Sequence, residues 1–147
     1  MNLAAPIHLV RLLLPGMLER GAGKIVNNAS IIGHAPFPGA SVYAASKTGL
    51  HGFSESLRRE LEATDVTLLE LVTPGVDTDM MAQVQRELDE HADTDGWDHV
   101  DPEDWAKKVV AAIESDEDEL NPGGAEALAK LLPKALIDLG AKRAFKR

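Results

Sequence analysis

Apolar residues follow two different periods along this chain, and the changes of period divide it into elements. Between residues 2 and 20 they recur every three or four positions, which is the spacing of one helix face. Leu9, Leu12 and Leu13 cover a second face, so we expect this helix to be buried on two sides. Pro15 should kink the helix or end its regular part.

Two short apolar runs, over residues 24–29 and 66–72, predict buried strands. Residues 31–40 contain several glycines and prolines and predict a loop. Residues 41–63 carry apolar and small side chains at helical spacing and predict the longest helix. Strands that alternate with helices imply an α/β fold with a parallel sheet.

The second half of the chain is more polar and predicts mainly helices. Its expected elements are a polar helix over 78–91, a loop over 92–100, a helix over 101–115, a linker over 116–124 and a last amphipathic helix over 125–145. Only two strands are therefore clear in the whole chain. Because parallel sheets are normally covered on both faces, this pattern indicates one half of a larger unit.

The composition narrows the possible functions. The chain has 147 residues, 44% of them hydrophobic, which is enough for one domain with a core. The net charge of −9 opposes binding to nucleic acids, because an acidic surface repels phosphate backbones. The longest apolar run is far too short to span a bilayer. We therefore expect neither a nucleic acid nor a membrane as partner.

The sequence contains no cysteine, which excludes a disulfide framework and a thiolate nucleophile. With no signal-peptide pattern at its start, we expect a cytoplasmic protein. The five histidines lack the spacing of metal ligands, so we expect no metal site. His34 could line a substrate pocket or face solvent in its loop. Trp97 and Trp105 could anchor a lid or pack in the core.

Tyr43 and Lys47 are four residues apart in the helix expected over 41–63, so they lie on one face, one turn apart. An ammonium beside a phenol stabilises the phenolate, which lets the phenol act as a general acid or base. Ser30 offers a second hydroxyl at the end of the first strand. These groups suit the reduction of a carbonyl or the oxidation of an alcohol. The hydride would come from a cofactor, because the chain carries no redox group.

The motifs around these residues resemble those of the short-chain dehydrogenase/reductase family. They are the strand Gly23-Lys-Ile-Val-Asn-Asn-Ala-Ser30, the stretch Tyr43-Ala-Ala-Ser-Lys47 followed by Gly49, Gly52 and Phe53, the turn Pro74-Gly75-Val76-Asp77-Thr78, and an opening helix that begins Met-Asn-Leu-Ala-Ala-Pro. The resemblance covers about residues 2–113. It implies a Rossmann-like, doubly wound parallel sheet, of which this chain carries the C-terminal half with two clear strands flanked by helices.

The resemblance also implies roles for individual residues. Tyr43 matches the catalytic acid/base, Lys47 the residue that supports this tyrosine and holds the nicotinamide ribose, and Ser30 the hydroxyl that orients the substrate. Asn2 matches an asparagine that holds a water in the proton relay. The implied cofactor is NAD or NADP, and the implied substrate is a small alcohol or carbonyl compound. The implied cofactor-binding residues are Tyr43, Lys47, Pro74, Gly75, Val76 and Thr78.

One part of the family pattern is missing from this sequence. The family places a Thr-Gly-x-x-x-Gly-x-Gly turn on its first strand, where it binds the adenosine half of the cofactor, and no such turn occurs here. We therefore expect a single partial domain over residues 1–147. Its expected parts are a catalytic core over 1–78, a substrate lid over 79–100 and C-terminal helices over 101–147.

Two functions remain open on this reasoning. The chain is either the catalytic half of an NAD(P)-dependent oxidoreductase, or a truncated, catalytically inactive remnant that serves as an oligomerisation or interaction module. For the chain by itself, we expect little or no activity. In both cases the resemblance implies a homo-oligomer that forms through helices 2–20 and 41–63.

Overall fold

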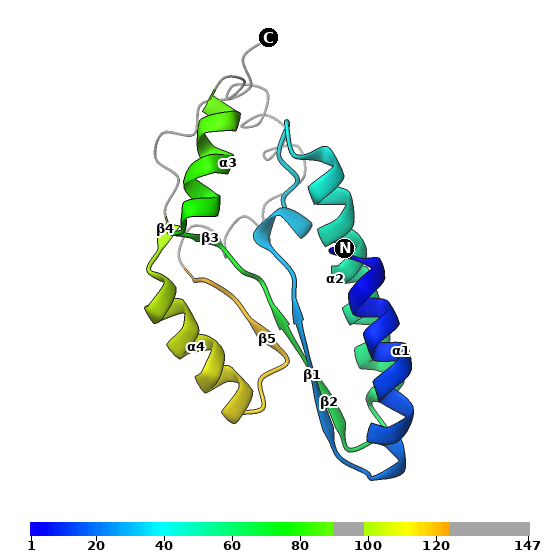
Figure 1. Ribbon diagram of the computed structural model, residues 1–147. Helices are drawn as coiled ribbons and strands as arrows, with labels where there is room; N and C mark the ends of the chain where they lie inside the picture. The colour runs from blue at the N-terminus through cyan, green and yellow to red at the C-terminus, as the bar shows by residue number, and fades with distance from the viewer. Residues whose placement is uncertain (90–98, 124–147) are drawn as a thin grey trace.

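The computed structural model describes residues 1–89 and 99–123, and its elements alternate between helices and strands (Figure 1). They are α1 (Ala4–Glu19), β1 (Gly23–Asn28), the short 3-10 helix η1 (Ile31–Gly33), α2 (Ser41–Leu61), β2 (Val66–Leu71), β3 (Gly75–Val76), α3 (Asp79–Asp89), β4 (His99–Val100), α4 (Pro102–Glu114) and β5 (Glu119–Leu120). The expected α/β fold is therefore confirmed. The helix expected over 125–145 and the side chain of Trp97 lie outside the described residues.

The main sheet has the strand order β1-β2-β5, and both of its pairings are parallel. Gly23 of β1 pairs with Val66 of β2, and this register continues to Asn28 and Leu71. A second, two-stranded parallel sheet joins β3 to β4. The expectation of only two strands was incomplete, because β3, β4 and β5 have two residues each and are too short to show a period.

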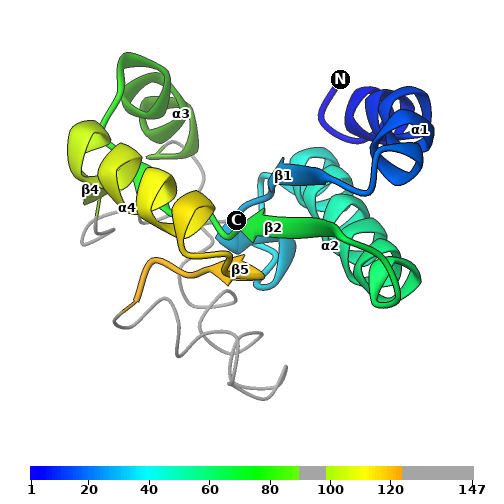
Figure 2. The ribbon, with the colours of Figure 1, turned by 90° about the horizontal axis from the view of Figure 1, so that it is seen from below.

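The main sheet lies between two layers of helices, with α1 and α2 on one side and α4 on the other (Figure 2). On the first side, Leu57 and Leu61 of α2 pack against the sheet residues Ile25 and Leu68. On the other side, Ala112 of α4 packs against the sheet and forms a separate apolar cluster with it. This cluster consists of Leu69, Leu71 and Ala112, with Val109 and Leu120 against it. Alternate residues of β2 thus face opposite layers, as the period of a strand requires.

Helix α2 carries the buried stripe that its sequence predicts. The buried residues repeat at three and four positions and are Ala44, Lys47, Leu50, Ser54, Leu57 and Leu61. Two of these are polar, and Ser54 satisfies its hydroxyl by donating to the Leu50 carbonyl oxygen and accepting from the Asn27 amide. Gly49 contributes close packing, because a Cβ at this position would lie 2.9 Å from Cδ2 of Leu3. Helix α1 therefore approaches α2 at this glycine.

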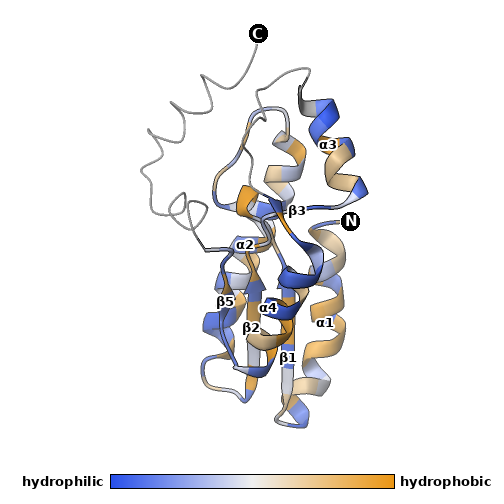
Figure 3. Cartoon of the chain, turned by 90° about the vertical axis from the view of Figure 1, so that its left-hand side faces the viewer, coloured by the Kyte–Doolittle hydropathy of each residue, from blue (hydrophilic) through white to orange (hydrophobic). Residues whose placement is uncertain are grey.

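Helix α1 does not match its prediction in one respect, because none of its residues is buried within the described part of the chain. Val10, Leu14 and Met17 pack partly against the core, but the second face is exposed, with Leu12 62% exposed. Figure 3 shows this helix largely in hydrophobic colours. Periodicity identifies an apolar face but not what covers it. Pro15 does not end the helix, which continues to Glu19.

Helix α4 begins as its sequence indicates. The Asp101 side chain accepts hydrogen bonds from the backbone N–H groups of Glu103 and Asp104, which caps the helix. Trp105 is 7% exposed and therefore belongs to the core, which decides between the two roles considered for it. Across the residues that the structure describes, no helix combines the length and the apolar character needed to cross a bilayer.

Candidate active site

The carboxyl ends of β1 and β2 are held together by two hydrogen bonds. The backbone N–H of Ile31 donates to the Thr73 carbonyl oxygen over 3.1 Å. The Thr73 hydroxyl donates to the side-chain oxygen Oδ1 of Asn28 over 2.6 Å. Parallel α/β sheets bind their ligands at the carboxyl ends of the strands. The expected site residues that follow these two strands therefore share the edge at which a ligand would bind.

Lys47 reaches this edge from α2. Its ammonium Nζ donates a hydrogen bond to the backbone carbonyl oxygen of Asn28 over 2.7 Å, and the residue is 9% exposed. Burial removes water from the ammonium and lowers the pKa of Lys47 from its ordinary value. The same Nζ lies 5.6 Å from the centroid of the Tyr43 ring. The structure thus brings the expected tyrosine and lysine together.

Tyr43 lies in the first turn of α2 and is 41% exposed. The residue lines an open hollow of about 480 Å³ that is also lined by Asn2 and Ser46. Asn2 is itself exposed and stands just before α1. Two of the expected catalytic residues therefore face one hollow.

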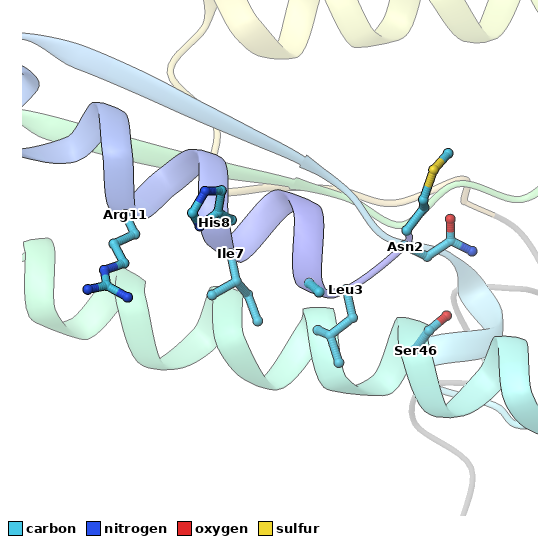
Figure 4. Close-up of a pocket in the computed structure, with 8 residues that line it drawn as sticks. Asn2, Leu3, Ile7, His8, Arg11 and Ser46 are labelled. Carbon is cyan, nitrogen blue, oxygen red and sulfur yellow. The ribbon is translucent and has the colours of Figure 1, made fainter.

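A second hollow, of about 570 Å³, adjoins the first and lies between α1 and α2 (Figure 4). Asn2 and Ser46 line both hollows. In Figure 4, Leu3 and Ile7 project towards α2, and Arg11 lies on α1 at the end of the hollow farthest from Asn2. The hollow beside Tyr43 thus continues along the groove between these two helices.

Ser30 is buried, at 8% exposed, and its hydroxyl accepts a weak hydrogen bond of 3.4 Å from the backbone N–H of Ile32. It precedes η1, which packs on α2 where the Thr48 hydroxyl donates to the Gly33 carbonyl oxygen over 3.0 Å. The structure places Ser30 just after β1 and Tyr43 on α2, the helix against which η1 packs. No hydrogen bond between described residues links the two side chains.

The expected cofactor loop follows β2. Pro74 is buried, and Gly75 and Val76 form the short strand β3, which pairs with His99 and Val100. The Thr78 hydroxyl accepts a hydrogen bond of 3.2 Å from the backbone N–H of Met81. Thr78 therefore caps α3, and the loop leads from the end of β2 to the N-terminus of that helix.

Two features of this region were not predicted from the sequence. Asn28 joins Lys47 to Thr73, since its backbone oxygen accepts from the first and its side chain from the second. His34 was expected to line a substrate pocket or face solvent, but its side chain is only 10% exposed and lies beside His51 and Glu70. Glu70, a charged residue in a strand of mostly aliphatic residues, was the signal that could have indicated this cluster.

Comparison with known proteins identifies the family. Residues 1–89 match the short chain dehydrogenase family, and the chain belongs to this family. Its α/β, Rossmann-like fold with a parallel sheet and flanking helices is the fold of solved members of the family. The resemblance drawn from the motifs around Tyr43 and Lys47 is therefore confirmed.

Individual relatives cover different parts of the chain. Ketoacyl reductase HetN of Nostoc sp. is 49% identical over 74 residues, which are 50% of this chain and 25% of that protein. Carbonyl reductase family member 4 of Xenopus tropicalis is 36% identical over 116 residues, 78% of this chain and 48% of that protein. A variant of actinorhodin polyketide ketoreductase, solved with NADPH, is 31% identical with a TM-score of 0.57 and covers 98% of this chain and 52% of its own. The chain thus spans between a quarter and about half of the length of these proteins.

Proposed function

We propose that this chain carries the proton-transfer half of an NAD(P)-dependent carbonyl reductase. The observation that carries the proposal is the position of the Lys47 ammonium, which the Asn28 carbonyl oxygen holds beside the Tyr43 ring. The substrate class is a small carbonyl compound or the corresponding alcohol. The relatives named as ketoacyl reductase, carbonyl reductase and ketoreductase support this class.

The residues at the strand ends fit a nicotinamide nucleotide. Lys47 has three N–H donors, and its one hydrogen bond to Asn28 leaves two of them for ribose hydroxyls. The loop from Pro74 to Thr78 leads to the N-terminus of α3, and the positive end of a helix dipole favours a phosphate. The related ketoreductase solved with NADPH supports the same class of cofactor. When bound, the reduced nicotinamide supplies a hydride to the carbonyl carbon.

In this proposal Tyr43 donates its hydroxyl proton to the carbonyl oxygen as that oxygen becomes an alcohol. The neighbouring Lys47 ammonium offsets the negative charge left on the phenol. Ser30 donates a hydrogen bond to the same oxygen and holds it in place. Asn2, which lines the hollow with Tyr43, binds the water through which the phenol regains its proton.

The proposal is tested by following nicotinamide absorbance while a panel of ketones and β-ketoacyl thioesters is reduced by NADPH or NADH. Tyr43→Phe should turn over about 10² to 10⁴ times more slowly than the wild type, because it lacks the acid. Arg59→Ala changes an exposed side chain of α2 that does not line this hollow and is the control. Measurable turnover that is equal in Tyr43→Phe and the wild type would refute the proposed role.

The second candidate function is an inactive remnant that acts through its helix surfaces. The exposed apolar face of α1 favours it. A fluorescence titration with NADH and NADPH separates the two candidates. Micromolar binding supports the reductase, whereas no binding by the folded chain supports the remnant.

For either candidate we propose a homo-oligomer in which α1 and α2 contact a second copy of the chain. Leu9, Leu12 and Leu13 of α1 are each more than half exposed, and Val42 of α2 is 84% exposed. These apolar side chains lie on two helices that already pack together, with Leu3 at the start of α1 against Gly49 of α2. A second copy would remove them from water.

A further inference from the structure

A cluster of three side chains lies beneath α2, on the sheet face opposite α4. Glu70 of β2 is fully buried, and His51 of α2 and His34 of the segment after η1 lie against it. Nδ1 of His51 is 3.0 Å from Oε1 and 3.2 Å from Oε2 of Glu70. Nε2 of His34 is 3.7 Å from the same Oε1. The three residues come from three different elements, so only the fold brings them together.

The His34 imidazole is the member of the cluster that its surroundings leave unsatisfied. Its Nε2 atom is buried and has no hydrogen-bond partner among the described residues, and the side chain is only 10% exposed. Buried polar atoms are normally paired, and an unpaired one costs about 1–3 kcal/mol. The distance of 3.7 Å to Glu70 is too long for a hydrogen bond. This nitrogen therefore lies near the Glu70 carboxylate without making a hydrogen bond to it.

The spacing of these atoms fits the coordination shell of a metal ion. The ligand atoms of His34, His51 and Glu70 lie within 4.8 Å of one another. Zinc bound at about 2.0–2.2 Å by nitrogen and oxygen in a tetrahedron places neighbouring ligand atoms roughly 3.3 Å apart. The distances of 3.0 and 3.7 Å to the Glu70 oxygen lie on either side of that value. Small side-chain movements would therefore bring these three atoms to three corners of such a shell and leave the fourth for water.

The chemistry of the ligands selects the kind of ion. Two imidazoles and one carboxylate suit a divalent transition metal such as zinc, cobalt or nickel, whereas magnesium and calcium prefer shells of oxygen atoms. A divalent cation would also compensate the buried carboxylate charge and give the His34 nitrogen a partner. We propose that His34, His51 and Glu70 form a binding site for one divalent transition-metal ion, with Nε2, Nδ1 and the carboxylate as ligands.

Such an ion would fix the segment between Ser30 and Tyr43. His34 lies in that segment, whereas His51 and Glu70 belong to α2 and β2. The segment already sits close to α2 at Gly33, where an added Cβ would lie 3.0 Å from the backbone oxygen of Lys47. The metal would add a second attachment one residue further on. This structural role is independent of whether the chain reduces carbonyl compounds.

The test is a titration of the tag-free, chelator-treated chain with Zn²⁺ in competition with a chromophoric chelator. We expect one Zn²⁺ per chain and no competition from Mg²⁺. His34→Ala and Glu70→Gln should weaken Zn²⁺ binding by more than about a hundredfold, because each removes a ligand and even neighbours of ligands matter tenfold to a hundredfold. His8→Ala removes an exposed histidine on α1 and should bind as the wild type does.

Co²⁺ gives a second measurement, because tetrahedral coordination produces strong visible absorption. The wild type and His8→Ala should show it, and His34→Ala should not. His34→Ala keeps the bond between His51 and Glu70, so this variant decides the result if circular dichroism shows Glu70→Gln unfolded. The proposal is overturned if the folded wild type binds none of Zn²⁺, Co²⁺ and Ni²⁺ stoichiometrically. It is equally overturned if folded His34→Ala binds Zn²⁺ as tightly as the wild type.

Discussion

Helices α1 and α2 cover the same face of the sheet, yet they relate to it in opposite ways. Helix α1 is rich in leucine and has no buried residue, whereas α2 is more polar and buries six residues in one stripe. One of these six is Lys47, whose ammonium is held at the end of β1. Apolar content alone therefore does not decide which helix anchors the fold. The position of a helix over the sheet decides it. The helix that is anchored, α2, is also the one that carries Tyr43 and Lys47.

The largest expected effect separates the two helices by stability. Leu57→Ala in α2 should lower the free energy of unfolding by about 2–5 kcal/mol, because it opens a cavity beside Ile25 and Leu68. Leu12→Ala in α1 should change it by less than about 0.5 kcal/mol in a monomer, because Leu12 is 62% exposed. Urea unfolding of both variants measures the difference.

The same pair of variants also tests what covers α1. If α1 contacts a second copy, Leu12→Ala should reduce the mass measured by light scattering at low concentration, whereas a still-folded Leu57→Ala should not. A large loss of stability in Leu12→Ala with an unchanged monomer mass would contradict the contrast drawn between the helices.

The second prediction concerns how Lys47 makes the free energy of unfolding depend on pH. Because burial lowers the pKa of Lys47 in the folded protein, the unfolded chain binds more protons between this lowered pKa and the ordinary lysine value. Stability should therefore gain a rising contribution as pH increases through that window. Lys47→Met should remove this contribution. The check is the difference in urea midpoint between wild type and variant from neutral to alkaline pH, and a pH-independent difference would be the contrary result.

The smallest expected effect concerns two glycines of α2, Gly49 and Gly52. Gly52→Ala should stabilise the monomer by about 0.5–1 kcal/mol, because alanine is the better helix former and a Cβ at this position meets no atom within 4 Å. Gly49→Ala is the matched comparison and should gain less, since its Cβ would displace Leu3 of α1. Thermal unfolding of the two variants ranks them, and the reverse order would show that α1 does not constrain this stripe.

Much of the fold could be predicted from the sequence because its main elements have clear periods. The buried runs over 24–29 and 66–72 and the helix over 41–63 correspond closely to β1, β2 and α2. The short strands could not be found in this way, since two residues define no period. The exposure of the second face of α1 was also hidden, because a pattern shows which residues are apolar but not which surfaces meet.

The candidate site was predictable to the extent that its residues lie near one another in the sequence. Tyr43 and Lys47 are one helical turn apart, so their proximity followed from helix geometry. The contact between His34 and Glu70 joins residues 36 positions apart on different elements, and no local rule indicates it. The link from Lys47 to Asn28 uses a backbone oxygen, which every residue has, so the side-chain identities carry no trace of it.

Asn28 has a practical consequence for anyone who wishes to redesign the selectivity of this protein. Its backbone oxygen accepts a hydrogen bond from Lys47 of α2, and its side-chain oxygen accepts one from Thr73 in the loop after β2. A replacement loop that begins after Thr73 keeps both hydrogen bonds of Asn28. A replacement that includes Thr73 loses the hydrogen bond to the Asn28 side chain. The safe boundary for loop engineering therefore lies two residues further along the chain than the end of β2 at Leu71.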